Sequence, residues 1–194
     1  MPIVTVQLLE GYDESAKGRL GRAFTDAVRS VIDAPPEVVT VIVQDLPRDG
    51  YMRGRTRRQP GPVLPDAAET VRAFLGEMEA RELDAARARL AEGFEMTFPG
   101  GVRMRTLDEL VAWARPRYRF VRKTYERFDT APAETETLVY CFGTLAGEWP
   151  DGTAFSGIRF IDRFALSGGK IVRQDVWNDI AEVKATVSTT GASA

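Results

Sequence analysis

The chain contains no histidine among its 194 residues. Histidine is the usual general base near neutral pH, a common metal ligand, and the base of the Ser-His-Asp and Cys-His nucleophile systems. Its absence excludes these mechanisms. Catalysis by this chain would therefore depend on carboxylates, tyrosine, lysine, arginine, the single cysteine or an amino-terminal amine. We expect no cofactor and no metal ion.

Cysteine and long apolar runs are also scarce. The single cysteine, Cys141, cannot form an intramolecular disulfide, and its apolar surroundings favour a core thiol over a nucleophile. The chain starts Met1-Pro2-Ile3-Val4, without the basic and apolar segments of a secretion signal. No apolar run approaches the roughly 20 residues of a membrane-spanning helix. We therefore expect a cytoplasmic protein with no membrane partner.

The chain has no excess of positive charge that would attract nucleic acid. It carries 26 basic and 28 acidic residues, a net charge of −2. Residues 115–123 interleave basic and aromatic side chains, as in surfaces that bind single-stranded nucleic acid. The end of a helix that leads into an outer strand has the same pattern. We expect a small-molecule partner and no nucleic acid.

The composition changes between about Pro47 and Pro65, where five arginines stand among glycines and prolines. This mixture is typical of a linker. The final segment is rich in Ser, Thr, Gly and Ala and has no periodicity, as in disordered tails. We therefore predict an N-terminal domain, a linker, a second domain and a disordered tail, at residues 1–58, 59–66, 67–184 and 185–194.

The first domain has the pattern of a β-α-β unit. Residues 3–9 are rich in β-branched side chains and predict a strand. Asp13 can cap a helix whose apolar residues follow the i, i+3, i+4 rule until Pro35-Pro36, and residues 38–43 predict a second, parallel strand. So few elements cannot cover both faces of the sheet. We therefore expect self-association into a dimer or higher oligomer.

The second domain begins with helices and ends with strands. Asp66 starts one helical pattern, and the capping box Thr106-x-x-Glu109 starts another, with a short strand over residues 93–98 between them. A tight turn at residues 167–169 joins the last two of four further strands. These are expected at residues 121–130, 137–148, 154–166 and 170–178. This order predicts an α+β fold, with a curved sheet wrapped over helices.

Pro2 is the sharpest catalytic candidate. Removal of Met1 would leave a free secondary amine, and α-amino groups titrate at about 7.7–8.0, so this amine can act as a base without histidine. Proline at this position also simply promotes removal of methionine. The run Pro2-Ile3-Val4-Thr5-Val6, followed by Glu10-Gly11, a helix and Val41-Ile42-Val43, resembles the 4-oxalocrotonate tautomerase family over about 55 residues. The resemblance implies oligomeric β-α-β subunits whose N-terminal proline moves protons between carbon and oxygen of keto and enol acids.

The same resemblance implies substrate-binding positions and shows departures at two of them. The family commonly has an arginine directly after Glu-Gly and another in the second strand, to bind the substrate carboxylate. This chain has Tyr12 and Thr40 there, whereas Tyr51 corresponds to the aromatic wall of the site. Arg53, with neighbouring arginines, is a candidate replacement for the lost anion binders or else a solvated linker residue. A small diacid is therefore a poor match as substrate.

The second domain resembles the SnoaL-like branch of the nuclear transport factor two superfamily over roughly residues 67–182. The resemblance rests on the order and spacing of Val71-Arg72-Ala73-Phe74-Leu75, Phe160-Ile161-Asp162-Arg163-Phe164 and Trp177-Asn178-Asp179. It implies a cystatin-like α+β cone around an apolar pocket, usually in a dimer. Members include polyketide cyclases, a ketosteroid isomerase and proteins without catalysis. The candidate pocket residues are Phe74, Phe98, Phe160 and Trp177.

Two aspartates are the candidate acid and base of this domain. Strand alternation places Asp162 in an apolar row with Phe160 and Phe164, where burial would raise its pKa and let the protonated acid donate to an oxyanion. An aspartate in this strand has that role in the resembled isomerases, but their tyrosine and basic aspartate correspond here to Phe74 and Phe98. Pairing with an arginine or a backbone amide is the alternative for Asp162. Asp175 is either a second acid/base group or part of a salt bridge at the rim.

Three functions remain open from the sequence. The first is a tautomerase-type isomerase, in which Pro2 transfers a proton and the second domain holds an apolar, polyketide-like ketone. The second is polyketide cyclase or isomerase chemistry through Asp162 and Asp175, with the first domain as an oligomerisation module. The third is a small-molecule binding protein without catalysis.

Overall fold

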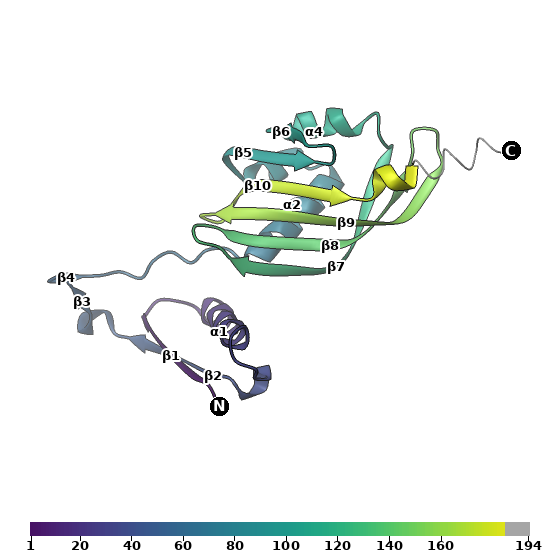
Figure 1. The fold of residues 1–194 in the computed structure, drawn as a ribbon. Coiled ribbons are helices and arrows are strands. Elements are labelled where there is room, and N and C mark those ends of the chain that lie inside the picture. Colours follow the sequence, from purple (N-terminus) through teal and green to yellow (C-terminus); the bar gives the residue numbers. More distant parts are fainter. Residues whose placement is uncertain (185–194) are drawn as a thin grey trace. The chain divides into compact units, whose positions relative to one another are not determined.

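The computed structural model describes residues 1–184, so the predicted disordered tail, residues 185–194, lies outside the described residues. The chain forms two compact units, the first over Met1–Val63 and the second from Leu64 onward. Helices and strands occur in both (Figure 1), which confirms the predicted α+β fold class. Within residues 1–184, no helix combines the length and the apolar character needed to cross a membrane.

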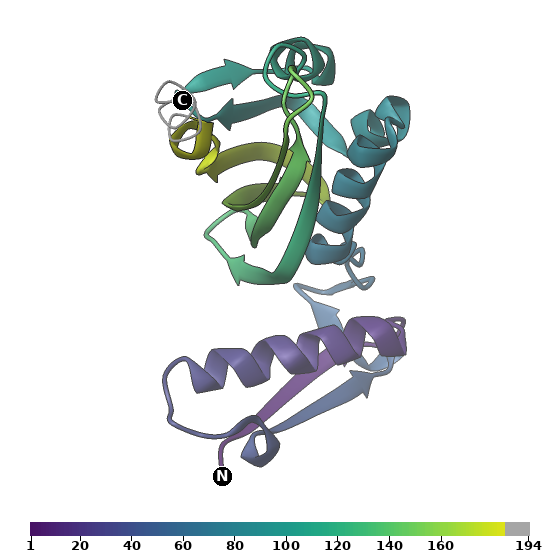
Figure 2. The same cartoon turned by 90° about the vertical axis from the view of Figure 1, so that its right-hand side faces the viewer.

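The first unit is the predicted β-α-β arrangement. Strand β1 (Ile3–Leu9) pairs in parallel with β2 (Thr40–Leu46), and helix α1 (Glu14–Arg29) lies along the pair (Figure 2). The helix starts where predicted, because the Asp13 carboxylate accepts a hydrogen bond from the Ala16 N–H at 2.7 Å. A short 3-10 turn, η1 (Pro36–Val38), leads into β2.

The arginine-rich segment after β2 contains a small hairpin that its linker-like composition did not predict. A 3-10 turn, η2 (Arg48–Gly50), precedes the antiparallel strands β3 (Met52–Arg53) and β4 (Thr56–Arg57). Gly54 and Arg55 join them, with φ of +59° and +63°. Two residues with positive φ make the turn that suits tight hairpins. Gly54 and Arg55 therefore form the turn of a hairpin within a segment whose composition is typical of a linker.

The second unit is a six-stranded sheet with helices. The strand order is β6-β5-β10-β9-β8-β7, and every neighbouring pair is antiparallel except β5 and β10, which are parallel. The helices that precede β7 are α2 (Ala67–Ala80), α3 (Leu83–Ala88) and α4 (Leu107–Ala114), and residues 180–184 after the last strand are also helical. The strands are β5 (Leu90–Phe98), β6 (Val102–Met104), β7 (Phe120–Pro132), β8 (Thr137–Glu148), β9 (Ala154–Ser167) and β10 (Lys170–Asn178).

Local signals in the sequence set the ends of these elements. The Asp66 carboxylate accepts from the Glu69 N–H at the start of α2. Both hydrogen bonds of the predicted capping box are present at α4, where Thr106 Oγ1 accepts from the Glu109 N–H at 3.2 Å and Glu109 accepts from the Thr106 N–H at 3.0 Å. The β9–β10 turn runs through Gly168 and Gly169, both with positive φ, as predicted.

The core of the second unit lies between α2 and the inner face of the sheet. Alternation along β9 is as predicted, with Phe160, Asp162 and Phe164 buried and the residues between them more exposed. The ring of Phe74 on α2 meets that of Phe164 edge-on, with 5.9 Å between centroids. Cys141 on β8 is fully buried as a free thiol in this core, as expected.

Glycine at position 147 allows close approach of β7 and β8. A Cβ added there would lie 2.2 Å from the Phe120 carbonyl oxygen. We expect Gly147→Ala to lower the free energy of unfolding by at least about 2 kcal/mol, because the strands must separate. Urea unfolding followed by tryptophan fluorescence would measure this, since all three tryptophans lie in the second unit. As the control, Gly76→Ala on α2 meets no atom within 4 Å and should stabilise by about 0.5–1 kcal/mol.

Candidate functional site

Pro2 and Thr40 lie side by side at the start of β1. The Pro2 carbonyl accepts a hydrogen bond from the Thr40 N–H at 3.0 Å, which extends the β1–β2 ladder to the second residue. The side chain of Thr40 is neutral, so it offers no charge to a substrate carboxylate at this position.

The other candidates of the first unit lie at the opposite end of β1. Tyr12, Tyr51 and Arg53 line a cavity of about 420 Å³, together with Gln7, Leu8, Leu9, Leu46, Arg58, Gln59, Pro60 and Gly61. Seven residues of strand separate the two ends, a distance of about 20 Å. A single copy of this unit therefore does not bring Pro2 together with Tyr12, Tyr51 and Arg53.

Two arginines give this cavity a positive wall. Arg53 was a candidate from the sequence. Arg58 was not, because it was counted among the arginines of the linker-like segment. Arg48 has a different role, because it donates to the Glu10 carbonyl and to Gln59 Oε1, each at 3.3 Å. Guanidinium groups bind carboxylates well, so the arrangement can hold an organic anion.

The second unit has its own cavity, of about 340 Å³, between the helices and the inner face of the sheet. Phe74 and Phe98, two of the predicted pocket residues, line it. Phe160 lies behind the wall, with its ring edge-on to that of Tyr125 at 5.8 Å. Trp177 points to the other face of the sheet and is 53% exposed, so it does not line this cavity. The other lining residues are Leu75, Met78, Glu79, Arg81, Leu110, Val111, Ala114, Tyr118, Phe120, Val121, Arg122, Lys123, Tyr125 and Gln174.

A buried ion pair lies at this cavity. Lys123 lines the cavity from β7, and its ammonium group donates a hydrogen bond to Oδ2 of Asp162 on β9, which is fully buried. Burial raises the pKa of Asp162 above its ordinary value, and the charge and hydrogen bond of Lys123 oppose that rise. The Lys123 Nζ also lies 4.5 Å from the centre of the Phe160 ring. Asp162 is therefore paired with a lysine, not with the arginine or backbone amide considered above.

Three other polar side chains close to the pair, those of Gln174, Tyr125 and Cys141, carry no charge at neutral pH. Gln174, 3% exposed, lines the cavity, and no described residue donates a hydrogen bond to its Oε1. Burial raises the pKa of Tyr125 far above its ordinary value, and nearby Cys141 and Asp162 contribute. Burial raises the pKa of Cys141 to about 12, so its thiol stays protonated and unreactive at neutral pH.

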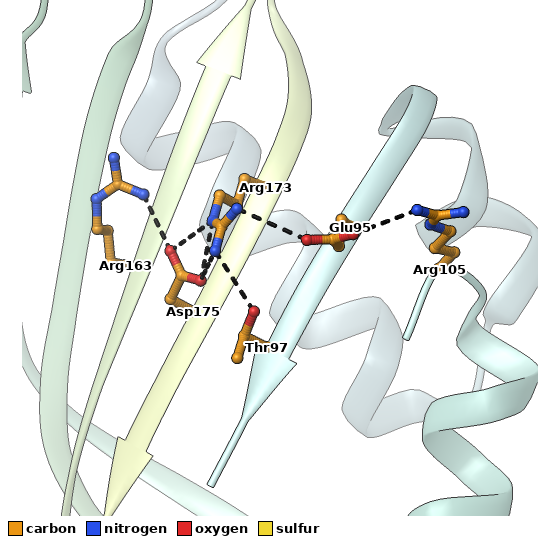
Figure 3. Close-up of polar contacts among 6 residues, drawn as sticks. All are labelled: Glu95, Thr97, Arg105, Arg163, Arg173 and Asp175. Atoms are coloured by element: carbon orange, nitrogen blue, oxygen red, sulfur yellow. Dashed lines mark hydrogen bonds and ion pairs between the residues drawn. The ribbon is translucent and has the colours of Figure 1, made fainter. Parts of the chain in front are cut away.

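Asp175 belongs to a separate polar network on the other face of the sheet (Figure 3). Its carboxylate accepts hydrogen bonds from Arg163 at 3.0 Å and from Arg173 at 2.9 Å. Arg173 lies 3.7 Å from Glu95, which in turn pairs with Arg105 at 3.6 Å. The structure therefore places Asp175 in ion pairs and does not bring it together with Asp162.

This network predicts a pH-dependent contribution to stability. Burial raises the pKa of Asp175, but the hydrogen bonds and charges of Arg173 and Arg163 outweigh it and hold the pKa below its ordinary value. The stabilisation is therefore present above the ordinary aspartate pKa of about 3.9 and is lost as the pH falls through the lowered value. We expect Asp175→Asn to cost about 1–3 kcal/mol of unfolding free energy at pH 7, and less below pH 4. A difference that grows on acidification would contradict this assignment.

Sequence reasoning missed most of the lining of this cavity, including its polar residues Lys123 and Gln174. Lys123 stands in the basic and aromatic run of residues 115–123, which was interpreted as the end of a helix that leads into an outer strand. The alternation of Val121, Lys123 and Tyr125 could have placed it on the inner face. Among residues 1–184, no three cysteine, aspartate or glutamate side chains converge in a way that could hold a metal ion.

Comparisons with solved structures agree with the fold of the second unit. An NTF2-like protein of unknown function from Burkholderia pseudomallei superposes with a TM-score of 0.53 and 20% identity, covering 62% of this chain and 95% of that one. TerC, crystallised with polyporic acid, gives a TM-score of 0.53 at 17% identity over 61% of this chain and 95% of its own. A protein from Jannaschia sp. CCS1 named as a putative SnoaL-like polyketide cyclase gives a TM-score of 0.50 at 16% identity, covering 66% of this chain and 94% of that one. The second unit therefore has the NTF2-like, SnoaL-like fold.

The first unit has relatives in sequence. A probable tautomerase of Halalkalibacterium halodurans is 41% identical over 51 residues, which are 26% of this chain and 84% of that protein. A probable tautomerase of Streptococcus thermophilus is 39% identical over 51 residues, which are again 26% of this chain and 84% of that protein. The sequence model of the tautomerase enzymes matches residues 2–57 and so begins at Pro2. Through this first unit, the chain belongs to the tautomerase family.

Proposed function

We propose that the chain is an isomerase in which the Pro2 amine, freed by removal of Met1, transfers a proton between the carbon and oxygen of a keto–enol pair. The observation that carries this proposal is the family match that begins at Pro2, in a chain without histidine. The position of Pro2 at the open start of β1 supports it, because only its carbonyl is used by the sheet. The protonated amine delivers its proton to the enol carbon, the enol oxygen releases its proton to water, and the amine then takes a proton back from water.

We further propose that the site is completed by a second copy of the chain. Tyr12, Tyr51 and Arg53 lie about 20 Å from Pro2 within one copy, so a neighbouring unit has to supply them. No residue of Met1–Val63 is fully buried, and Ile3 and Ile42 expose 63% and 41% of their surface on the sheet face away from α1. A second copy that covered this face would bury apolar surface that a single unit exposes to water, which would favour association.

The cavity of the second unit supports an apolar substrate that carries a ketone or enol. Its wall is mostly aromatic and aliphatic, with a few polar groups, as is usual for small-molecule sites. An aromatic or polyketide-like compound suits this wall better than a small diacid. The proposal therefore assigns proton transfer to the first unit and substrate holding to the second.

Turnover of an aromatic enol acid tests the proposed activity. We expect the chain to accelerate the ketonisation of phenylenolpyruvate, followed by the loss of ultraviolet absorbance. Lys17→Met is a suitable control, because Lys17 only pairs with Asp45 on the surface of the first unit and its loss should leave the rate unchanged. No acceleration, together with tight binding of an apolar ligand, would instead support a binding protein without catalysis.

The burial of Asp162 at the second cavity favours one other candidate function. Cyclase or isomerase chemistry in that unit would use the Asp162 carboxyl, whose pKa is raised by burial, and the first unit would serve assembly. Asp175 would take no part in chemistry at this cavity, because it lies on the outer face of the sheet in ion pairs with Arg163 and Arg173. Under this function, Asp162→Asn abolishes turnover and Pro2→Ala does not.

A further inference from the structure

The buried pair of Lys123 and Asp162 is a group of titratable side chains that the Pro2 chemistry does not use. Lys123 reaches the 340 Å³ cavity, with its side chain 20% exposed, while Asp162 lies behind it with no exposed surface. The ammonium group is therefore the end of the pair that a ligand in the cavity meets. The remaining wall around it is largely apolar.

The choice of lysine at this position is informative. The chain has 22 arginines but only four lysines, at positions 17, 123, 170 and 184. Arginine is the residue that usually serves buried ion pairs, because its planar group binds a carboxylate with two hydrogen bonds and keeps its proton. Lysine differs in that it can release its proton and then act as a nucleophile.

The outer face of the same sheet provides an internal comparison. There, Asp175 is held by Arg163 and Arg173, and those arginines hold its pKa low (Figure 3). At the cavity, Asp162 is held by one lysine and its pKa is raised, chiefly by burial. The outer network pairs its carboxylate with guanidinium groups, which keep their protons, whereas the inner pair joins a carboxylate to an ammonium group, a type of group that can give up its proton. Transfer of that proton to the carboxylate would remove both charges from the interior.

We propose that Lys123 is an amine nucleophile that captures an aldehyde or ketone in this cavity as an imine, with Asp162 carrying the protons. This deepens the proposed function, on which it rests for a carbonyl compound as the ligand of the cavity. It adds a covalent chemistry to the molecule, independent of the proton transfer by Pro2.

The proton movements balance without any further reactant. Asp162 takes a proton from the Lys123 ammonium, and the Nζ lone pair adds to the carbonyl carbon while the C=O π pair moves to oxygen. Asp162 returns its proton to that oxygen and takes one from the nitrogen, which leaves a neutral carbinolamine. The C–O bond then breaks, the leaving hydroxide takes the proton of Asp162 and departs as water, and a protonated imine forms. The Asp162 carboxylate remains paired with this cation, as it was with the ammonium.

Two features of the cavity fit these intermediates. Gln174 Oε1, buried and without a donor among the described residues, can accept from the carbinolamine hydroxyl. The Phe160 ring, 4.5 Å from the Lys123 Nζ, favours a positive charge on that nitrogen in both the ammonium and the protonated imine.

Reductive trapping on the whole chain tests the proposal without any turnover assay. The protein is incubated at neutral pH with 2-naphthaldehyde and sodium cyanoborohydride, which fixes imines as stable amines, and the adducts are located by peptide mapping. We expect Lys123 to be modified at least tenfold faster than Lys17 or Lys170, which serve as internal references. Excess naphthalene, which has the same ring system without a carbonyl, should slow modification of Lys123 and leave Lys17 unchanged. Equal rates at the three lysines, or no protection by naphthalene, would overturn the proposal.

A conservative variant separates nucleophilic reactivity from structure. Lys123→Arg keeps a cation beside Asp162 but cannot form an imine. We expect the cavity adduct to disappear in this variant, with the Lys17 adduct unchanged. If the number of adducts in the second unit did not fall in this variant, the assignment to Lys123 would be contradicted. If the variant does not fold, the peptide map of the wild-type chain still shows whether Lys123 is the modified residue. An adduct at Pro2 falls in a different peptide, so this result and that of the enol assay can fail independently.

Discussion

Replacement of Pro2 by alanine is expected to reduce the ketonisation of an aromatic enol acid by at least about 100-fold. A positioned general base or acid typically contributes 10²- to 10⁴-fold, and this chain has no histidine that could take over the task. The primary amine of an N-terminal alanine lacks the geometry of the pyrrolidine nitrogen. The loss should appear in kcat, because the substrate is still bound by other groups.

The fold should tolerate this replacement. Pro2 contributes a carbonyl to the ladder, through the bond from the Thr40 N–H, and alanine keeps that carbonyl. Pro36→Ala is a matched control, since it changes a proline of the same unit in the turn before β2. Activity of Pro2→Ala within a few-fold of the unmodified chain would contradict the proposed role, whereas loss in both variants would indicate a general defect in folding.

Replacement of Lys123 by methionine is expected to destabilise the second unit by about 3–5 kcal/mol at pH 7. The change leaves the Asp162 carboxylate buried without its cation, which is the costly way to break a buried ion pair. The double replacement Lys123→Met with Asp162→Asn should recover most of the loss, because no charge remains in the core. Lys17→Met is the control for the loss of a lysine in an exposed pair, and it should cost less than about 1 kcal/mol.

The effect of Lys123→Met also has a predicted pH dependence. Burial raises the pKa of Asp162 in the folded state, and loss of Lys123 removes the main group that opposes this rise. The folded variant then binds its proton more tightly than the unfolded chain does, so its stability falls as the pH rises above the ordinary aspartate value of about 3.9. Urea unfolding of variant and parent at several pH values, followed by tryptophan fluorescence, would show it. A cost that is independent of pH would mean that Asp162 carries no charge in the parent.

Local patterns predicted most of the elements of both units. Asp13 and the Thr106–Glu109 pair marked helix starts through hydrogen bonds that span three residues, which a sequence displays directly. Strands 137–148 and 170–178 were predicted with their observed bounds. The short strand β6 was missed, because three residues carry too little pattern.

The candidate sites were harder to predict, because they depend on contacts between distant residues. Lys123 and Asp162 are separated by 39 residues, and only the order β7-β8-β9 brings them together across the inner face of the sheet. The sequence grouped Asp162 with Asp175, whereas the hairpin register pairs Asp175 with Arg163 and turns it to the other face. Trp177 follows Asp175 by two residues and therefore lies on the same outer face, away from the cavity.

The central claim is that a free Pro2 amine performs the chemistry, and the state of the N-terminus tests it most directly. Preparations treated or not treated with methionine aminopeptidase can be compared by intact mass and by their rate with phenylenolpyruvate. A retained Met1 makes the Pro2 nitrogen an amide without basicity, so the rate should rise in proportion to the fraction of chains that lack Met1. An equal rate in chains that keep Met1 would contradict the claim.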